Sequence, residues 1–162
     1  MVRCVFLNKL EKELWLPVLF DMLYYNMCAI APRGLTYEDE KKQWLCSVST
    51  ALEKAPRQII LCFSGDELVG YIQYYTRGEL LMVEEAQIRK PYQKTFVFYC
   101  MCKYLYSNIP ENIQYIEAFV DERNLYSSKL MNKLGMKQIE DDSAVPFVHL
   151  RGNTDGIKKY FR

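Results

Sequence analysis

The chain has 162 residues, of which 50% are hydrophobic and 25% are charged, proportions that are typical of a globular domain. Its 21 Lys and Arg residues nearly balance its 20 Asp and Glu residues, and the net charge is +1. Since there is no basic excess to neutralise phosphates, nucleic-acid binding is disfavoured as a main role. No apolar run approaches the ~18 residues of a membrane span, so no membrane partner is expected.

The length suits one domain, which we expect to cover residues 1–162. Six cysteines are scattered along it, at positions 4, 28, 46, 62, 100 and 102. They form no CxxC pair, and the single histidine, His149, is far from all of them in sequence, so no metal site is expected. The N-terminus lacks the layout of a signal peptide. We therefore expect reduced, mostly buried thiols in a cytoplasmic protein.

The first half of the chain predicts two helices and four strands. The apolar run at residues 2–7 predicts a strand. A helix then starts near Asn8, and Pro17 should kink or restart it; a second helix opens at Thr36 and buries Trp44. Three consecutive antiparallel strands follow, joined by polar turns. Their sequences are RQIILCF (57–63), LVGYIQYY (68–75) and LLMVEEAQI (80–88).

The second half predicts two further helices, at residues 95–106 and 124–134. Strands are predicted at residues 113–120, 137–139 and 145–150. The element order β-α-α-β-β-β-α-β-α-β-β combines a strand meander with β-α-β crossovers. It predicts an α/β (α+β) fold, with a mixed, mostly antiparallel sheet of six to seven strands and four helices on both faces.

The segment NLYSSKLMNKLGM, at residues 124–136, carries the clearest motif. Asn124 suits a helix N-cap and Gly135 suits the C′ position, although a helix that only packs on the sheet would look similar. Together with Val120, the pattern V…N..S..LM.KLGM resembles motif B of the GNAT acyltransferase superfamily, whose usual form is V…N..A..LY.KLGF. The segment IRKPYQKTFVF (88–98) lies where motif A belongs, and GDELVGYI (65–72) is similar to the family's hairpin between the second and third strands.

The resemblance implies an N-acetyltransferase that binds acetyl-CoA as co-substrate in a V-shaped gap between the fourth and fifth strands. A bulge in the fourth strand would open the gap, and backbone amides near Ile88 would bind the pantetheine arm. The pyrophosphate would lie at the N-terminus of the following helix. The implied cofactor-binding residues are Ile88, Gln93, Lys94, Thr95, Phe96, Val97, Phe98, Asn124 and Ser127.

The chain departs from the family in motif A. Phe96 and Phe98 stand where the family has small residues that let a diphosphate approach the backbone. Their rings either turn into the core, which leaves the amides usable, or fill the pocket. Lys94 and the Thr95 hydroxyl offer partial compensation to an anion.

Three residues are candidates for catalysis. Amine acetylation needs a base, because an amine of pKa ~10.4 is protonated at neutral pH. By resemblance Glu84 faces the gap, with Glu85 on the opposite face of the strand, and Glu117 faces the gap from the fifth strand. Met131 replaces the tyrosine that many relatives use as an acid, and methionine cannot donate a proton. Tyr126, one turn back, is a candidate substitute, although a packing role also fits it.

Three readings of the function therefore stay open. The first is an N-acetyltransferase in which a small-molecule or protein amine attacks acetyl-CoA directly in a ternary complex. The alternative is a catalytically impaired GNAT-like domain that serves as a ligand-binding or protein-interaction module, which the two phenylalanines and Met131 favour. A different acyl carrier in the gap is a third reading. Relatives in this family are often dimers, so a homodimer is compatible with the resemblance.

Overall fold

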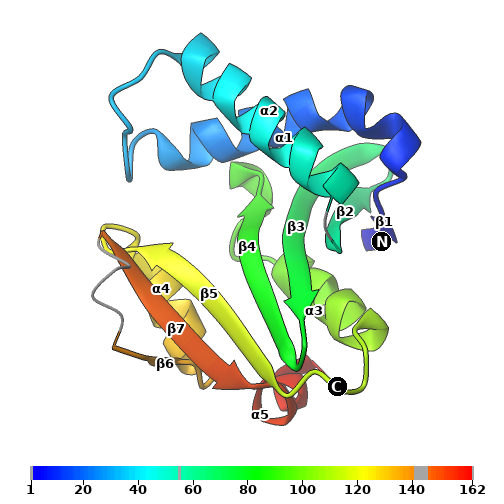
Figure 1. Ribbon diagram of the computed structural model, residues 1–162, viewed down its shortest axis with the longest axis vertical. Coiled ribbons are helices and arrows are strands. Elements are labelled where there is room, and N and C mark those ends of the chain that lie inside the picture. The colour runs from blue at the N-terminus through cyan, green and yellow to red at the C-terminus, as the bar shows by residue number, and fades with distance from the viewer. Residues whose placement is uncertain (1, 55, 141–145, 162) are drawn as a thin grey trace.

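The computed structural model describes residues 2–54, 56–140 and 146–161. Within them, one seven-stranded sheet has the order β1-β2-β3-β4-β5-β7-β6 (Figure 1). All neighbouring strands are antiparallel except β4 and β5, which are parallel. The strands are β1 (Val2–Phe6), β2 (Arg57–Ser64), β3 (Glu67–Arg77), β4 (Leu80–Ile88), β5 (Tyr115–Asp121), β6 (Lys137–Gln138) and β7 (Phe147–Asn153).

Five α-helices accompany this sheet in the described ranges. They are α1 (Lys12–Met27), α2 (Tyr37–Lys54), α3 (Val97–Asn108), α4 (Leu125–Lys133) and α5 (Thr154–Lys158). Helices α1 and α2 cover one face of the sheet, and α3 and α4 pack on the other (Figure 1). Over the same described residues, no helix is long and apolar enough to cross a membrane.

The alternation of side chains along each strand builds two cores. On β2, Ile59 and Leu61 pack under α1 and α2, whereas Ile60 and Cys62 pack under α3. This is the period-two pattern of a strand that is buried on both faces. The predicted mixed, mostly antiparallel sheet with helices on both faces is thereby confirmed.

Helix α1 follows a short 3-10 turn, Lys9–Glu11, which Asn8 caps by accepting the Leu10 amide at 3.1 Å. The helix then runs without interruption through Pro17, so the expected restart at this proline is wrong. Pro17 removes one interior hydrogen bond, but Leu16 and Leu19 on either side of it are buried in the core. Tertiary packing of this kind stabilises a helix more than propensity does.

The C-terminal elements differ from the predicted ones in two ways. The last predicted strand begins at residue 145, which lies outside the described residues, and β7 continues beyond the expected end, to Asn153. Helix α5 was not predicted, since its five residues are too few to show a helical period. The residue in the sequence that indicates the start of this helix is Asn153. Its side-chain oxygen accepts hydrogen bonds from the amides of Asp155 at 2.9 Å and Gly156 at 3.3 Å, as an N-cap does.

The cysteines also differ from the prediction. Cys4 and Cys62 form a disulfide between β1 and β2, and their Cα atoms are 4.3 Å apart at directly opposed positions of the antiparallel register. Cys28 and Cys46 are exposed. The prediction of reduced thiols is therefore wrong for Cys4 and Cys62, because a pairing between residues 58 positions apart depends on a strand register that cysteine spacing does not reveal. The prediction of burial is wrong for Cys28 and Cys46, which are free thiols.

Candidate functional site

The candidate site lies where β4 and β5 separate. The two strands pair from Leu80 to Val83 on β4 and from Tyr115 to Ala118 on β5. Their pairing ends there, although β4 continues to Ile88 and β5 to Asp121. Figure 1 shows the strands splaying apart from their common end. The predicted V-shaped gap between the fourth and fifth strands is present.

Glu84 is the extra residue of a β-bulge in β4. Gln73 of β3 pairs with Glu85, and the next residue, Tyr74, pairs with Val83, so Glu84 has no counterpart in this register. A bulge bends its strand and increases the local twist. The predicted bulge is thus present, directly after the last residue of β4 that pairs with β5.

The Glu84 carboxylate is held from the side of β2 and β3. The Nε and Nη2 groups of Arg57 donate to its two oxygens, and Gln73 Nε2 donates to it at 3.1 Å. Glu84 lines the gap, as predicted, but it does so as one partner of an ion pair.

The Glu85 side chain lies on the face of the sheet that α1 and α2 cover. It accepts hydrogen bonds from Trp44 Nε1 of α2 at 2.8 Å and from the Tyr71 hydroxyl at 2.6 Å. Tyr71 and Gln73 are two residues apart on β3 and so share a face. Since Glu84 binds Gln73 and Glu85 binds Tyr71, the expectation that the two glutamates point to opposite faces is wrong. Burial raises the pKa of the Glu85 carboxyl, and the hydrogen bonds from Trp44 and Tyr71 offset that rise only in part.

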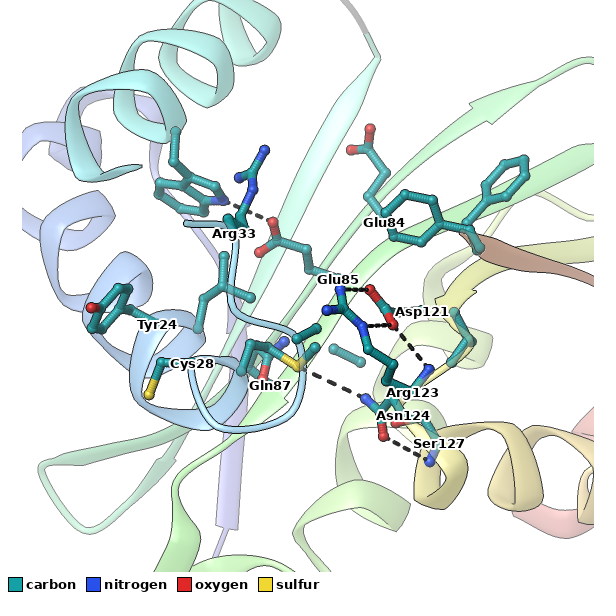
Figure 2. A pocket seen from close by; sticks show the side chains of 18 of the residues that line it. Tyr24, Cys28, Arg33, Glu84, Glu85, Gln87, Asp121, Arg123, Asn124 and Ser127 are labelled. Carbon is teal, nitrogen blue, oxygen red and sulfur yellow. Dashed lines mark hydrogen bonds and ion pairs between the residues drawn. The ribbon is translucent and has the colours of Figure 1, made fainter. Parts of the chain in front are cut away.

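The gap opens into a cavity of about 730 Å³ (Figure 2). One wall is the diverging part of β4, and the facing wall is the end of β5 with the first turns of α4. The third wall is formed by α1, the segment between α1 and α2, and the first turns of α2. Polar or charged side chains in these walls are Arg33, Glu40, Glu84, Glu85, Gln87, Asp121, Arg123, Asn124 and Ser127.

Backbone amides of β4 point toward the gap. The Arg89 amide donates to the Val69 carbonyl of β3 at 2.9 Å. In an antiparallel pair, successive residues point alternately toward and away from the partner strand. The amides of Ile88 and Ala86 therefore point away from β3, toward β5. The Ile88 carbonyl points the same way and accepts the Gln93 side-chain amide at 3.0 Å.

The two phenylalanines of motif A take different positions. Phe96 is the N-cap residue of α3 and is 61% exposed. Phe98 packs against Phe161 near the C-terminus, with ring centroids 6.3 Å apart. Neither ring belongs to the cavity wall. Of the two outcomes expected for these rings, packing on the core holds for Phe98, whereas the expectation is wrong for Phe96, whose exposed ring neither enters the core nor lines the cavity.

Hydrogen bonds within the segment before α3 fix its conformation. The Thr95 hydroxyl donates to the Tyr92 carbonyl at 2.6 Å and accepts the Val97 amide at 3.4 Å. Lys94 has a φ of +64°, in the left-handed region that residues other than glycine seldom adopt. The predicted residues Gln93 to Phe98 thus surround the start of α3, outside the wall of the cavity.

Asn124 and Ser127 lie together in the cavity wall, as predicted. The Asn124 side-chain oxygen accepts the Ser127 amide at 3.2 Å and so caps α4. Beside them, Arg123 binds the Asp121 carboxylate at 2.8 and 2.9 Å, which lowers the pKa of that carboxyl. Sequence reasoning missed Asp121 and Arg123, whose signal was their place directly after a predicted strand.

The other predicted catalytic residues lie apart from the cavity. Glu117 is buried on β5 and binds Arg151 and His149 of β7, with 2.8 Å between Glu117 Oε2 and His149 Nε2. Phe119, the next residue on this face of β5, does line the cavity and stacks on His149 with 4.2 Å between ring centroids. Tyr126 is exposed and outside the wall.

No protein-family model and no curated protein matches this sequence. Solved structures do match. A PaiA N-acetyltransferase from Thermoplasma acidophilum in complex with coenzyme A has a TM-score of 0.73 and 12% identity over 94% of this chain and 99% of that one. An acetyltransferase from Thermus thermophilus has a TM-score of 0.73 and 17% identity, over 94% of this chain and 97% of that one. A GNAT-family acetyltransferase from Staphylococcus aureus has a TM-score of 0.70 and 14% identity, over 95% of this chain and 99% of that one.

Proposed function

We propose that this chain, whose fold is that of the GNAT acetyltransferases, belongs to that superfamily and transfers the acetyl group of acetyl-CoA to an amine. The observation that supports this proposal most strongly is the opening between β4 and β5, which leads into a cavity of about 730 Å³. A thioester on a long, amide-containing arm needs both a slot and hydrogen-bonding groups along it. The diverging strands supply the slot, and the amides of Ala86 and Ile88 supply donors.

We place the pantetheine arm between β4 and α4, with Ala86 and Ile88 on one side and Asn124 and Ser127 on the other. The pyrophosphate then lies at the start of α3, where unpaired amides and the helix dipole favour an anion. Gln93, Lys94, Thr95 and Val97 surround that position. The Phe98 ring packs on Phe161 and the Phe96 ring is exposed, whereas the Val97 amide is bonded to the Thr95 hydroxyl at 3.4 Å and would exchange that bond for the anion.

The transfer is a direct attack within a complex of protein, acetyl-CoA and amine. The ammonium form of the acceptor first loses one proton to a carboxylate at the gap, because only the neutral amine is nucleophilic. Its nitrogen then bonds to the thioester carbon, the carbon–sulfur bond breaks, and the second proton passes from nitrogen to sulfur, directly or through water. The products are an N-acetylated amine and coenzyme A with a free thiol.

Two carboxylates can act as the base. Glu84 is the predicted one, but Arg57 binds both of its oxygens. Glu85 lines the same wall, and its raised pKa makes it a stronger base than an ordinary carboxylate. Glu84→Gln and Glu85→Gln separate the two, since loss of a general base lowers kcat by roughly 10²–10⁴-fold. Glu117 and Tyr126 take no step in this scheme, because neither lines the cavity.

Two neighbouring serines of α4 test the proposal. Ser127 belongs to the cavity wall, whereas Ser128 does not. We expect Ser127→Phe to weaken acetyl-CoA binding by about tenfold or more in calorimetry, and Ser128→Phe to change it little. Circular dichroism checks that both variants are folded. If the wild-type protein binds no acetyl-CoA at millimolar concentration, or if Ser127→Phe binds it as well as the wild type does, the proposal fails.

A binding module without catalysis is the second candidate, and Met131 in the cavity wall favours it, since methionine cannot protonate a leaving thiolate. Coenzyme A has a thiol, whose pKa by analogy with cysteine is ~8.5, so that its departure needs little assistance. Release of free thiol from acetyl-CoA in the presence of amines decides between the two functions. Tight binding with no amine-dependent release identifies the module.

A further inference from the structure

Three of the six charged side chains in the cavity wall have an ion-pair partner. Asp121 is paired with Arg123 at 2.8 Å. Glu84 is paired with Arg57, and both of these side chains are largely shielded from solvent. A ligand would gain little from either carboxylate, because each is already neutralised.

Glu85 and Glu40 are the two carboxylates of the wall without an ion-pair partner among the described residues, and Glu85 is the one at the gap. Its hydrogen-bond donors, the Trp44 indole and the Tyr71 hydroxyl, are both neutral. Arg33 and Glu40 also line the cavity, with one charge of each sign, and within the described part of the chain no ion pair joins Arg33 to Glu85 (Figure 2). Glu85 is therefore a carboxylate without an ion-pair partner in a poorly solvated place. A cation that enters with a ligand would stabilise it.

Two aromatic rings line the same cavity as this carboxylate. Val83 and Ala118 are the last residues at which β4 and β5 pair. The next residues, at the apex of the gap, are Glu84 with Glu85 on β4 and Phe119 on β5. Phe119 is 41% exposed, and Phe147 of β7, which also lines the cavity, is 47% exposed. Both rings are thus available for contact with a ligand.

Much of the helical wall is apolar, although Glu40 of α2 also belongs to it. Leu23, Tyr24 and Met27 of α1 and Trp44 of α2 line it. Leu23 and Met27 offer no hydrogen-bond donor, and the Trp44 N–H is already bound by Glu85. A ligand with many polar groups would leave most of them unpaired against this wall, which is costly.

We propose that the acceptor at this site is a primary amine carried on an apolar aromatic body, with its ammonium group at Glu85 and its ring against Phe119 and Phe147. This inference rests on the proposed function, because it names the acceptor of that reaction. A polyamine has no ring to contact Phe119 and Phe147, and an amino sugar would need partners for its hydroxyl groups. Aromatic faces add a favourable contact to an ammonium group.

Calorimetry at saturating coenzyme A tests acceptor binding separately from catalysis. The probes are 2-phenylethylamine, the anion 3-phenylpropanoate and neutral 2-phenylethanol, which share a ring and differ in charge, together with spermidine and glucosamine. We expect 2-phenylethylamine to bind about tenfold or more tightly than each of the others. Glu85→Gln should weaken its binding by about tenfold, and Phe147→Ala by several-fold. Glu38→Gln, an exposed carboxylate of α2 outside the cavity wall, is the matched control and should change nothing.

Tighter binding of 3-phenylpropanoate, spermidine or glucosamine overturns the inference, and so does the absence of 2-phenylethylamine binding in a protein that binds coenzyme A. An unchanged affinity in a folded Glu85→Gln variant overturns the assignment of the ammonium site. The ligand series on the wild-type protein decides the matter if that variant does not fold. Binding in the expected order without thiol release from acetyl-CoA supports the acceptor class and refutes only the transfer reaction.

Discussion

Gly70 marks a close approach between β3, β4 and α3, and its substitution tests the packing that positions β4 beside the gap. Gly70 pairs with Ile88, the last residue of β4. A Cβ atom at Gly70 would lie 2.9 Å from the carbonyl oxygen of Gln87 and 2.9 Å from Sδ of Met101 in α3. Both distances are shorter than van der Waals contact, so β4 or α3 has to move in Gly70→Ala.

We expect Gly70→Ala to lower the free energy of unfolding by about 1–3 kcal/mol, the usual cost of overpacking. For a domain of this size, that cost corresponds to a decrease in Tm of about 2–12 °C. The flexible Met101 side chain can move aside, but the Gln87 carbonyl belongs to the backbone of β4. Because the displaced segment carries the amides of Ala86 and Ile88, acetyl-CoA affinity should fall together with stability.

Thermal unfolding followed by circular dichroism measures the effect on stability, and calorimetry measures the affinity. Gly156→Ala in α5 is the matched control, since a Cβ atom there meets nothing within 4 Å and alanine favours a helix by up to ~1 kcal/mol. If Gly70→Ala unfolds within about 1 °C of the wild-type protein, the contact between these three elements is looser than described, and the reasoning is refuted.

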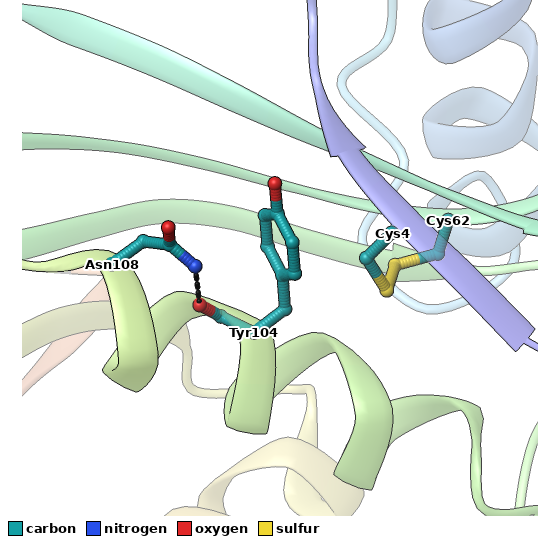
Figure 3. Close-up of a disulfide and its surroundings, with 4 residues drawn as sticks. All are labelled: Cys4, Cys62, Tyr104 and Asn108. Atoms are coloured by element: carbon teal, nitrogen blue, oxygen red, sulfur yellow. Dashed lines mark hydrogen bonds between the residues drawn. A yellow bond between two sulfur atoms is a disulfide. The ribbon is translucent and has the colours of Figure 1, made fainter.

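Three further predictions concern Glu85, Arg57 and the disulfide. Burial raises the pKa of Glu85 in the folded state, so its ionisation opposes folding as the pH rises. In urea unfolding, Glu85→Gln should therefore be more stable than the wild type at about pH 8 and should lose that advantage at about pH 4. Arg57→Met leaves Glu84 unpaired and should cost about 1–3 kcal/mol, less in the Glu84→Gln background, as a double-mutant cycle would measure. Reduction of the Cys4–Cys62 disulfide (Figure 3) should lower stability by about 2–4 kcal/mol without changing acetyl-CoA affinity, because β1 lies at the sheet edge remote from β5.

The order of the elements could be predicted because most of them are long enough to show a period. The meander from residue 57 to residue 88 alternates apolar runs with polar turns, and its three strands lie where the sequence places them. Helix α5 could not be predicted, because a helix of five residues is too short to show a helical period. The continuation of α1 through Pro17 depends on the core beneath it, which local propensity does not include.

Within the site, Asn124 and Ser127 could be placed in the cavity wall only through the resemblance to motif B, whereas their capping relation could be read from the sequence. The side-chain directions of Glu84 and Glu85 could not, since a bulge adds one residue and breaks strand alternation. The partners of Glu117 depend on the register of β5 with β7, which no local pattern specifies. The walls from α1 and α2 arise from long-range packing in the same way.

The central claim is that the opening between β4 and β5 receives coenzyme A and its acyl group. Amide hydrogen exchange resolved by residue, with and without coenzyme A, tests this claim most directly. We predict that exchange at Ala86 and Ile88 slows when coenzyme A binds, while the Gln87 amide, which points toward β3, changes little. Unchanged exchange at Ala86 and Ile88 under saturating coenzyme A would contradict the account.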